Sequence, residues 1–574
     1  MKLLKKILIV LAIGLVPIIA CDTDALIELN DNPNAVLDLD WRYVLSEAQV
    51  SSAENRGVNW KPGQIICSQL IQHYASSGTN NGDKYIRGAL TVDHQTIPFH
   101  DIYDNAMKET GELIRRCGPN GSNPEMTNTY NCARIMYVYL AQMITDFYGN
   151  VPYFGANRGV EGSEFFLPEY DPQQEIYTRE GIGEGEVRGG LLWELDDAAA
   201  GLASAGIDNL ASADLYFAGD LSKWRKWAYS MMLRAAMRIY EEDPATATTY
   251  INKAIAGGVM TSNADNCWIQ MASGPSEWFH QNGMSRGMRP GSGGEGHGSI
   301  RPSETLIDFL KDNNDPRLMM ISGGVGSWDQ CYNDMPECLK DPADQIGRPN
   351  GWNNGDDDPA DGQGAGIEFW CTTDPDCSAK WDGVTSIDPT YFFSLAHPFL
   401  YDLDEPYFFQ TYAEVELLLA EIVERGIATT GSTAQQHYER GVRAAIERFV
   451  THDASFAVDA AVIDAYLLEP NIAYTSGNAG LEKIAWQHWL ATFMAPNHWE
   501  TFAYWRRAGR PTLLQVDWFP GQSPPKIWRK FIYDQSDVAI NGDNFSKGAT
   551  LPNEETTQMW WDQGYDGVGN QTGI

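Results

Sequence analysis

The sequence predicts a mainly α-helical protein in which helix pairs of the tetratricopeptide sort are joined by a long, loop-rich region. Three observations predict this fold. Apolar residues recur with helical spacing toward both ends of the chain, two of these segments follow each other closely enough to pair, and residues 274–406 are rich in Gly, Pro, Asn and Asp. With 574 residues, of which 43% are hydrophobic, the chain can bury a large core.

The clearest helix is predicted for residues 129–147. Its apolar side chains recur at i, i+3, i+4 and i+7 and form one stripe, which is typical of a helix packed on a core. Residues 220–240 repeat the pattern. The tryptophans with helical spacing are therefore assigned to the core or scaffold: Trp224, Trp227, Trp486 and Trp489.

A second pair of helices is predicted further along the chain. Residues 408–425 interleave glutamates with an aliphatic face, and Gly426 ends the segment as a glycine just past the helix. Residues 438–449 again have helical spacing and form the expected antiparallel partner. Helix pairs of this kind stack into solenoids, although the sequence shows no strict repeat of about 34 residues.

The loop-rich region, residues 274–406, is expected to lie over this helical scaffold and to contain short helices such as 303–311. Its tryptophans and cysteines indicate that it is ordered. The tryptophans without helical spacing are Trp278, Trp328, Trp352, Trp370 and Trp381.

The N-terminus is typical of a bacterial lipoprotein signal. A positively charged start, residues 1–6, precedes an apolar run, 7–19, that is too short to span a bilayer. Ala20 stands directly before Cys21, where cleavage would leave a cysteine that carries acyl chains. We therefore expect a signal peptide over residues 1–20 and a lipidated polar tether over 21–34. Plain secretion with a coincidental Cys21 is the alternative.

The charge of the chain excludes nucleic-acid binding as a main activity. The 41 Lys and Arg residues face 77 Asp and Glu residues, which gives a net charge of −36, whereas proteins that bind phosphate backbones need a basic surface. The same acidity argues against a polyanionic glycan as ligand, because the protein repels it at long range.

The cysteines agree with an exported protein. Apart from Cys21 there are eight, an even number in a compartment where disulfides persist: Cys67, Cys117, Cys132, Cys267, Cys331, Cys338, Cys371 and Cys377. The close pairs Cys331/Cys338 and Cys371/Cys377 are candidates to cross-link the loop-rich region. Disulfides or free thiols are both favoured over a zinc site, because no CxxC occurs and the neighbouring histidines lack ligand spacing.

A series of short motifs follows one another along the chain. They are 146–153 (DFYGNVPY), 170–177 (YDPQQEIY), 219–224 (GDLSKW), 233–238 (LRAAMR), 301–308 (RPSETLID), 412–421 (YAEVELLLAE), 506–511 (RRAGRP) and 560–562 (WWD). In this order they resemble the SusD/RagB-type nutrient-binding outer-membrane lipoproteins. One motif departs from the family pattern, because Asp534 stands where an Arg-x-x-Tyr-Pro segment has proline.

The resemblance implies one domain over residues 35–574, with the insertion at about 274–406. Its fold would be an α-superhelical scaffold of four tetratricopeptide-like helix pairs, packed against an irregular, loop-rich ligand-binding half. Such proteins face the cell exterior at the outer membrane and cap a SusC-like TonB-dependent transporter. They deliver oligosaccharides or, in some members, peptides to it.

A protein that binds a neutral sugar needs flat apolar faces and a few polar groups that fix its orientation. The candidate binding residues are those in the irregular half: Trp278, Trp328, Trp352, Trp370 and Trp381, with Asn282 and Arg289 as polar neighbours. For any one tryptophan the alternative is a role in packing.

An acidic stretch at residues 353–362 offers oxygen ligands of the kind that calcium takes, from Asp356, Asp358 and Asp361. Because its spacing departs from that of an EF-hand, a solvated acidic loop is the preferred explanation. No cofactor is required, and a structural calcium ion is the metal that stays open.

A secreted helical glycoside hydrolase is the competing hypothesis. It needs a pair of carboxylates, and Glu500 is the best candidate, although it lies in a segment that the family resemblance treats as structural. The sequence therefore favours a non-catalytic binder. Oligosaccharide and peptide both stay open as ligands.

Overall fold

The computed structural model describes residues 40–53, 55–76, 81–85, 87, 89–183, 186–204, 206–274, 280–288, 300–351, 393–493, 497–514, 516 and 526–565. It divides into two units, residues 1–44 and 45–574. In the first unit the described residues are the start of helix α3 (Trp41–Ser52), where Asp40 Oδ1 accepts a hydrogen bond of 3.0 Å from the backbone N–H of Arg42.

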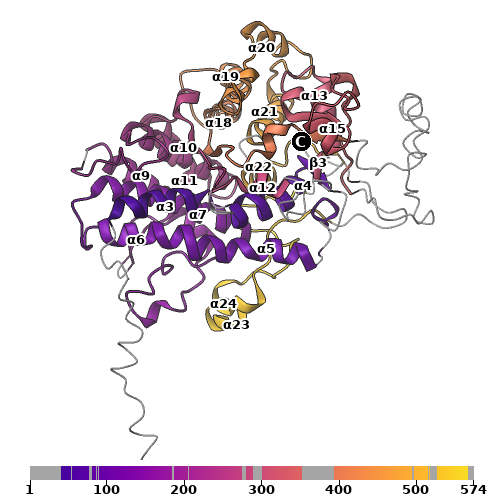
Figure 1. Cartoon of the computed structure of the whole chain (residues 1–574). Coiled ribbons are helices and arrows are strands. Elements are labelled where there is room, and N and C mark those ends of the chain that lie inside the picture. The colour runs from indigo at the N-terminus through magenta and orange to yellow at the C-terminus, as the bar shows by residue number, and fades with distance from the viewer. Residues whose placement is uncertain are drawn as a thin grey trace, which may run out of the picture. The chain divides into compact units, whose positions relative to one another are not determined.

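Helices make up most of the described part of the second unit, as predicted (Figure 1). The longer ones are α5 (Ala89–Asp101), α6 (Met107–Cys117), α7 (Thr127–Tyr148), α9 (Leu191–Gly201), α10 (Leu221–Ile239), α11 (Pro244–Gly257), α18 (Tyr412–Glu424), α19 (Ala434–Glu447), α21 (Gly477–Phe493) and α22 (His498–Ala508), together with the π-helix η2 (Asn55–Cys67). Neighbours in the chain pack in pairs: α6 on α7, α9 on α10, α10 on α11, and α18 on α19. This is the helix-pair arrangement that the sequence predicts.

The predicted helices are present with shifted ends. The segment 129–147 is α7, and 220–240 is α10, which begins where Asp220 accepts from the backbone N–H groups of Ser222 and Lys223. The segment 408–425 differs, because residues Tyr407–Gln410 form strand β6 and the helix begins only after Thr411, which caps it.

Helix α19 starts earlier than the segment 438–449 indicates. Thr433 and Gln436 form a reciprocal capping box at its N-terminus, so the helix begins at Ala434. A capping box is a local hydrogen-bonding arrangement, and the apolar spacing that marked the segment begins only a turn later.

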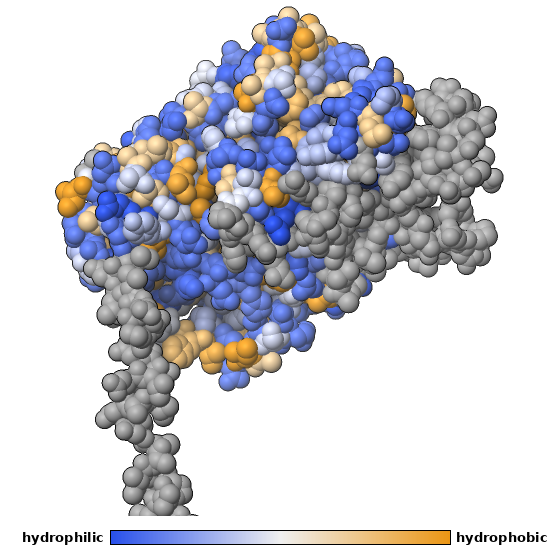
Figure 2. All heavy atoms as spheres, in the orientation of Figure 1, coloured by the Kyte–Doolittle hydropathy of each residue, from blue (hydrophilic) through white to orange (hydrophobic). Residues whose placement is uncertain are grey.

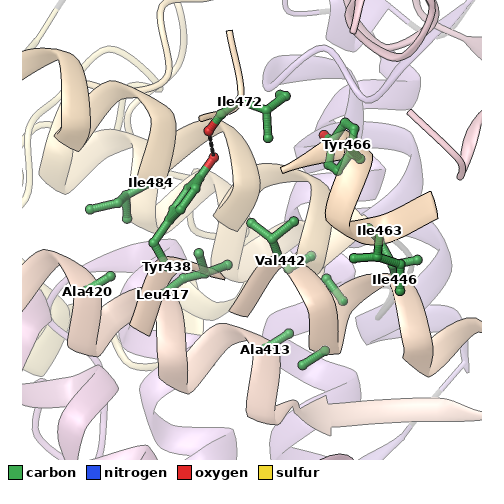
Figure 3. Close-up of a cluster of buried hydrophobic side chains, with 13 residues drawn as sticks. Ala413, Leu417, Ala420, Tyr438, Val442, Ile446, Ile463, Tyr466, Ile472 and Ile484 are labelled. Carbon is green, nitrogen blue, oxygen red and sulfur yellow. Dashed lines mark hydrogen bonds between the residues drawn. The ribbon is translucent and has the colours of Figure 1, made fainter. Parts of the chain in front are cut away.

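The pair α18–α19 shows how the scaffold is packed (Figure 3). Gly441 of α19 lies against α18 so closely that an added Cβ would be 2.7 Å from Cγ of Leu417. Tyr438 crosses to the loop after α20 (Ala460–Tyr466), where its hydroxyl donates to the carbonyl of Ile472 at 2.7 Å. The buried residues of this cluster are Ala413, Leu417, Ala420, Tyr438, Val442, Ala444, Ala445, Ile446, Ile463, Tyr466, Ile472, Ile484 and Ala491.

Buried ion pairs connect four helices in the core. Arg238 of α10 binds Asp146 of α7 (Nε–Oδ2 3.1 Å) and Glu500 of α22. Arg234, one turn earlier, forms two parallel hydrogen bonds of 2.7 Å each with Glu414 of α18. All five side chains are at most 1% exposed. Because unpaired buried charges are strongly unfavourable, these contacts fix how the helices align.

A further buried pair joins α18 to α22. Both oxygens of Glu421 accept hydrogen bonds of 2.7 Å from Arg507. Burial alone would raise the pKa of Glu421, but the guanidinium groups of Arg507 and Arg425 outweigh it and lower the pKa to about 2.

The described part of the loop-rich region contains short elements. They are α12 (Gly283–Met288), β3 (Ile300–Pro302), α13 (Glu304–Asp312), α14 (Leu318–Ile321), β4 (Ser322–Val325), α15 (Trp328–Tyr332), β5 (Ser394–Ala396) and the 3₁₀ turn η10 (Pro398–Tyr401). The predicted helix at 303–311 is α13, capped by Ser303. Among the described strands, three antiparallel pairs form: β1 (Tyr74–Ser76) with β3, β2 (Cys267–Ile269) with β6, and β4 with β5.

The C-terminal segment returns to the first helices of the unit, next to the short helices α23 (Gln535–Ile540) and α24 (Gly542–Gly548) (Figure 1). Phe531 stacks on Phe147 of α7, with ring centroids 4.5 Å apart. The hydroxyl of Tyr533 donates to the carbonyl of Tyr148 at 2.7 Å. Residues far apart in the sequence therefore complete the core around α7.

Among the described cysteines, Cys331 and Cys338 form a disulfide, which confirms the first predicted pair. The second pair, Cys371 and Cys377, lies outside the described residues. Four cysteines are reduced and buried: Cys67, Cys117, Cys132 and Cys267. Burial raises the pKa of each of these thiols, to about 12 for Cys117, which makes them unreactive.

The surface in view is largely hydrophilic, and hydrophobic residues gather at its lower edge, near α23 and α24 (Figure 2). The exposed apolar side chains of that part of the structure include Phe166, Leu167 and Ile540, which line a groove of about 290 Å³. Of the helices described, none has the length and apolar character needed to cross a membrane.

We expect the substitution Arg234→Met to destabilise the protein strongly. It leaves the carboxylate of Glu414 buried without its partner, which costs about 3–5 kcal/mol in comparable cases. Lys253→Met is the matched control, because its pair with Asp196 is partly exposed and contributes at most about 1 kcal/mol. Urea unfolding followed by circular dichroism measures both values. Equal losses for the two variants would contradict the structural role given to the buried pairs.

Candidate functional site

The structure describes two of the predicted ligand-binding residues, Trp328 and Asn282. The other predicted residues lie outside the described part of the chain, and so do the lipidation site and the candidate calcium ligands. These are Trp278, Arg289, Trp352, Trp370, Trp381, Cys21, Asp356, Asp358 and Asp361. Their roles stay predictions.

Trp328 forms a stacked aromatic pair at the start of α15. Its ring lies on that of Tyr332, one helical turn later, with centroids 4.5 Å apart and planes 21° apart. Trp328 is half-buried, and Tyr332 is 42% exposed. The ring of Tyr401 supports Trp328 edge-on at 4.3 Å. We call this pair and its supporting ring, Trp328, Tyr332 and Tyr401, the aromatic surface.

The backbone below the aromatic surface is held by a covalent bond. The disulfide between Cys331 and Cys338 closes the loop that follows Trp328, and both cysteines pack with Leu395 of β5. A disulfide that closes so short a loop stabilises by about 2–3 kcal/mol in the chain-entropy account. Val325 and Leu339 also exchange backbone hydrogen bonds of 3.0 Å. The aromatic surface is thus presented by a rigid part of the loop-rich region.

Asn282 lies inside the fold and is 1% exposed. Its backbone N–H donates to the carbonyl of Leu403 at 2.7 Å, and its side-chain oxygen accepts from the backbone N–H of Ser285 at 3.2 Å. Its amide nitrogen donates to the carbonyl of Glu405 at 3.3 Å. In the structure Asn282 therefore caps α12 and braces the loop before β6.

Buried polar side-chain atoms without a hydrogen-bond partner occur on η2 and on elements that pack on it. Gln64 on η2, Gln69 on α4 (Ser68–Leu70) and Ser285 on α12 each have a side-chain atom that is buried and without a hydrogen-bond partner. In folded proteins, buried groups of this kind are normally satisfied by ordered water or by polar groups of a ligand. Helix α12 also packs on η10, which carries Tyr401 of the aromatic surface.

The loop that Asn282 braces contains a neutral acid. Burial raises the pKa of Glu405 to about 9, and the neighbouring carboxylates Asp402, Asp404 and Asp453 act in the same direction. Burial, with Arg448 nearby, lowers the pKa of His452 to about 3. The 2.6 Å contact between Glu405 Oε2 and His452 Nδ1 is thus a hydrogen bond that the protonated acid donates to a neutral imidazole at pH 7.

The carboxylate proposed for a hydrolase, Glu500, does not reach the surface. Burial raises its pKa to about 7, but it is 1% exposed and its oxygen is bound to Arg238. Glu500, Glu414 and His488 have ligand atoms within 4.8 Å of one another. Because both carboxylates are already paired with arginines, the group is unsuited to a divalent cation.

Sequence reasoning missed Tyr332 and Tyr401 as parts of the aromatic surface. The four-residue spacing of Trp328 and Tyr332 was an available signal, because side chains at i and i+4 lie on the same face of a helix. Nothing in the sequence placed Tyr401 beneath them, since η10 lies beyond a segment of more than sixty residues.

The SusD-like family model, described as starch-binding and associating with the outer membrane, matches residues 33–533. The chain belongs to the SusD-like family. It is therefore a nutrient-binding outer-membrane protein without catalytic activity. This agrees with the inaccessible position of Glu500 and excludes the hydrolase hypothesis.

Several solved structures have the same fold as this chain. A chitin-binding protein is 27% identical, with a TM-score of 0.70, and the match covers 91% of this chain and 100% of that one. A SusD-like protein from Bacteroidetes is 20% identical, with a TM-score of 0.71 and coverage of 91% and 100%. A SusD homologue from Bacteroides uniformis is 20% identical, with a TM-score of 0.65 and coverage of 91% and 99%. None of the curated proteins compared with this chain matches it.

We expect the stability of this SusD-like protein to fall as the pH rises from about 4.5 to 9, because the unfolded chain loses the proton of Glu405 while the folded protein keeps it. The folded state holds that proton up to a pKa of about 9, whereas the ordinary value is 4.5. The contribution is therefore fully present below about pH 4.5 and is lost as the pH rises toward 9. The variant Glu405→Gln keeps a neutral donor to His452 at every pH. Between pH 6 and 9 the wild type should lose about 1 kcal/mol or more relative to this variant.

Thermal unfolding of both proteins across this pH range provides the measurement. Glu447→Gln, an exposed substitution on α19, is the matched control and should keep the pH dependence of the wild type. Parallel curves for the wild type and Glu405→Gln would show that Glu405 is ionised in the folded protein at neutral pH.

Proposed function

We propose that this SusD-like protein binds neutral oligosaccharides on its aromatic surface and passes them to a SusC-like TonB-dependent transporter. The observation that carries the proposal is the stacked pair of Trp328 and Tyr332. It offers a flat apolar face that is partly open to solvent and rigidly supported.

The chemistry of the aromatic surface suits a pyranose ring. The C–H faces of a sugar pack on aromatic rings, and a few polar groups then select orientation. Tyrosine and tryptophan combine a large apolar face with a polar tip, and the exposed Tyr332 can exchange hydrogen bonds with sugar hydroxyls. The net charge of −36 favours a neutral glycan over a polyanionic one.

Chitin oligosaccharides are the first ligands to test. The support comes from the chitin-binding protein that is 27% identical over 91% of this chain. Met335, which is 41% exposed, follows Trp328 within the disulfide-closed loop. Its apolar side chain is suited to contact with the methyl group of an N-acetyl substituent.

The proposal includes attachment to the outer membrane through acyl chains on Cys21, with residues 21–34 as a polar tether. The description of the family as associating with the outer membrane supports this location. A tethered cap that moves over a transporter needs such a linker.

The substitution Cys21→Ala should abolish labelling by radioactive palmitate and release the protein from the membrane fraction. Palmitate labelling that persists in Cys21→Ala would contradict anchoring at Cys21.

Isothermal titration of the protein that begins after Cys21 tests ligand binding. The panel contains chitin oligosaccharides, malto-oligosaccharides, anionic glycans and tryptic peptides, and each mixture is checked for cleavage products. We expect saturable heat with a neutral oligosaccharide and no new products. Saturable heat with peptides alone would replace the sugar with a peptide as ligand.

The substitution Trp328→Ala should lower affinity for the bound oligosaccharide at least about tenfold, as expected for a central aromatic contact. Phe166→Ala is the matched control, because Phe166 is an exposed aromatic residue, 66% exposed, outside the aromatic surface. Circular dichroism confirms that both variants are folded. Wild-type affinity in Trp328→Ala would place the sugar site elsewhere.

A further inference from the structure

The helical scaffold contains a cavity whose lining includes none of the residues of the aromatic surface. It has a volume of about 620 Å³ and is bounded by α6, the start of α7, residues 157–161, Ile182 and residues 186–188. This volume is in the range of small-molecule sites, about 300–1,000 Å³. A much smaller cavity of about 10 Å³, with room for about one water molecule, shares Arg188 with it.

The lining of the cavity contains a buried arginine, Arg188. It is 4% exposed, and its guanidinium lies over the ring of Tyr137, 3.9 Å from the ring centroid. Its Nη1 donates to the hydroxyl of Tyr137 and to the carbonyl of Tyr153, the latter at 2.7 Å. These contacts fix the position and the plane of the charged group.

The opposite edge of the same guanidinium has no protein partner. Nε is buried and makes no hydrogen bond. In the described part of the chain, Nη2 also donates to nothing, and no carboxylate forms an ion pair with Arg188. A buried charge without a counter-ion is unfavourable, so this edge is suited to an anionic group from outside the chain.

Two other buried arginines of this protein bind a carboxylate with that edge, whereas Arg506 binds backbone carbonyls with it. Arg234 holds Glu414 through Nε and Nη2, both at 2.7 Å. Arg317 holds Asp315 through the same two atoms, at 2.8 and 2.6 Å. In both cases the partner is a carboxylate bound by two parallel hydrogen bonds, which is the geometry that the planar guanidinium favours.

The remaining charges of the cavity wall are already compensated. Arg115 pairs with Glu112 at 2.7 Å, and Arg158 pairs with Glu161 at 2.6 Å. Glu186 also has a partner, because it pairs with an arginine of the preceding loop at 2.5 Å. The open guanidinium edge thus provides one unmatched positive charge, in a wall that also carries carboxylates.

Glu194, which lines the smaller cavity, is also occupied. One of its oxygens accepts from Arg134 Nε at 2.6 Å, and the other accepts from the backbone N–H of Gly189 at 2.6 Å. Glu194 therefore does not serve as the missing counter-ion of Arg188.

We propose that this cavity binds a small molecule with a single carboxylate, which the Nε–Nη2 edge of Arg188 receives. Glu161, Glu186 and the carbonyl end of α6 accept hydrogen bonds from hydroxyl or ammonium groups on the rest of the ligand. The same carboxylates repel ions with two negative charges. A sugar acid and the C-terminus of a short peptide share this chemistry.

Isothermal titration with defined probes tests the proposal. Glucuronate is compared with glucose and with methyl glucuronate, and N-acetyl-glycylglycine with its amide; inorganic phosphate is the dianionic probe. We expect saturable binding of glucuronate or of the acetylated dipeptide, and at least a tenfold loss when the carboxylate is esterified or amidated. The better of the two acids identifies the source of the ligand. Binding of neither acid at millimolar concentration would overturn the proposal.

Variants tie the binding to the cavity. Ile182→Glu puts a negative charge at the cavity wall, on a side chain that is 46% exposed, and should weaken carboxylate binding at least tenfold. Ile207→Glu is the matched control, because Ile207 is 78% exposed and does not line the cavity, and it should bind as the wild type does. Arg188→Gln should abolish binding. If that variant does not fold, Ile182→Glu decides alone, and wild-type affinity in it would refute the assignment.

Discussion

The architecture depends on charges that are buried in pairs. Arginines of α10 reach α7, α18 and α22, and Arg507 of α22 reaches back to α18. Each helix can pack only where its charged side chains meet their partners, because a buried charge without a partner destabilises by several kcal/mol. Apolar packing alone lets one helix slide along another, whereas an arginine–carboxylate pair with two parallel hydrogen bonds holds both helices in one position. The loop-rich region, and the aromatic surface on it, rest on a scaffold whose register is fixed in this way.

The sequence was sufficient to predict the helices, but it was not sufficient to predict the ion pairs and strand contacts that connect them. Apolar spacing marks a helix because the chain repeats every 3.6 residues, and α7 and α10 were found at nearly their full length. Glu414 and Glu421 have the composition of a solvent-facing stripe, yet both are buried against arginines. Only the approach of distant helices reveals such pairs. Strand β6 was missed for the same reason, since its partner β2 lies far away in the sequence.

The candidate site was predictable where local spacing carries information. Cys331 and Cys338 were paired correctly because they are close in sequence, and Trp328 was selected because it lies outside the helical stripes. Its neighbour Tyr332 belongs to a helix of five residues, so its four-residue spacing from Trp328 was a weak signal. Nothing in the sequence marked Arg188 as a candidate binding residue. A single arginine in a loop becomes a candidate only when the structure shows which of its nitrogen atoms lack hydrogen-bond partners.

The return of the C-terminal segment to α7 bears on how this protein folds during export. Tyr533 and Tyr148, which are joined by a hydrogen bond, are 385 residues apart. In a chain that is translocated N-terminus first, the end of α7 that Phe531 and Tyr533 cover therefore stays exposed until nearly all of the chain has crossed. Contacts between such distant residues slow folding and prolong the exposure of apolar surface that is prone to aggregation. The core around α7 is therefore completed only when the C-terminal segment becomes available.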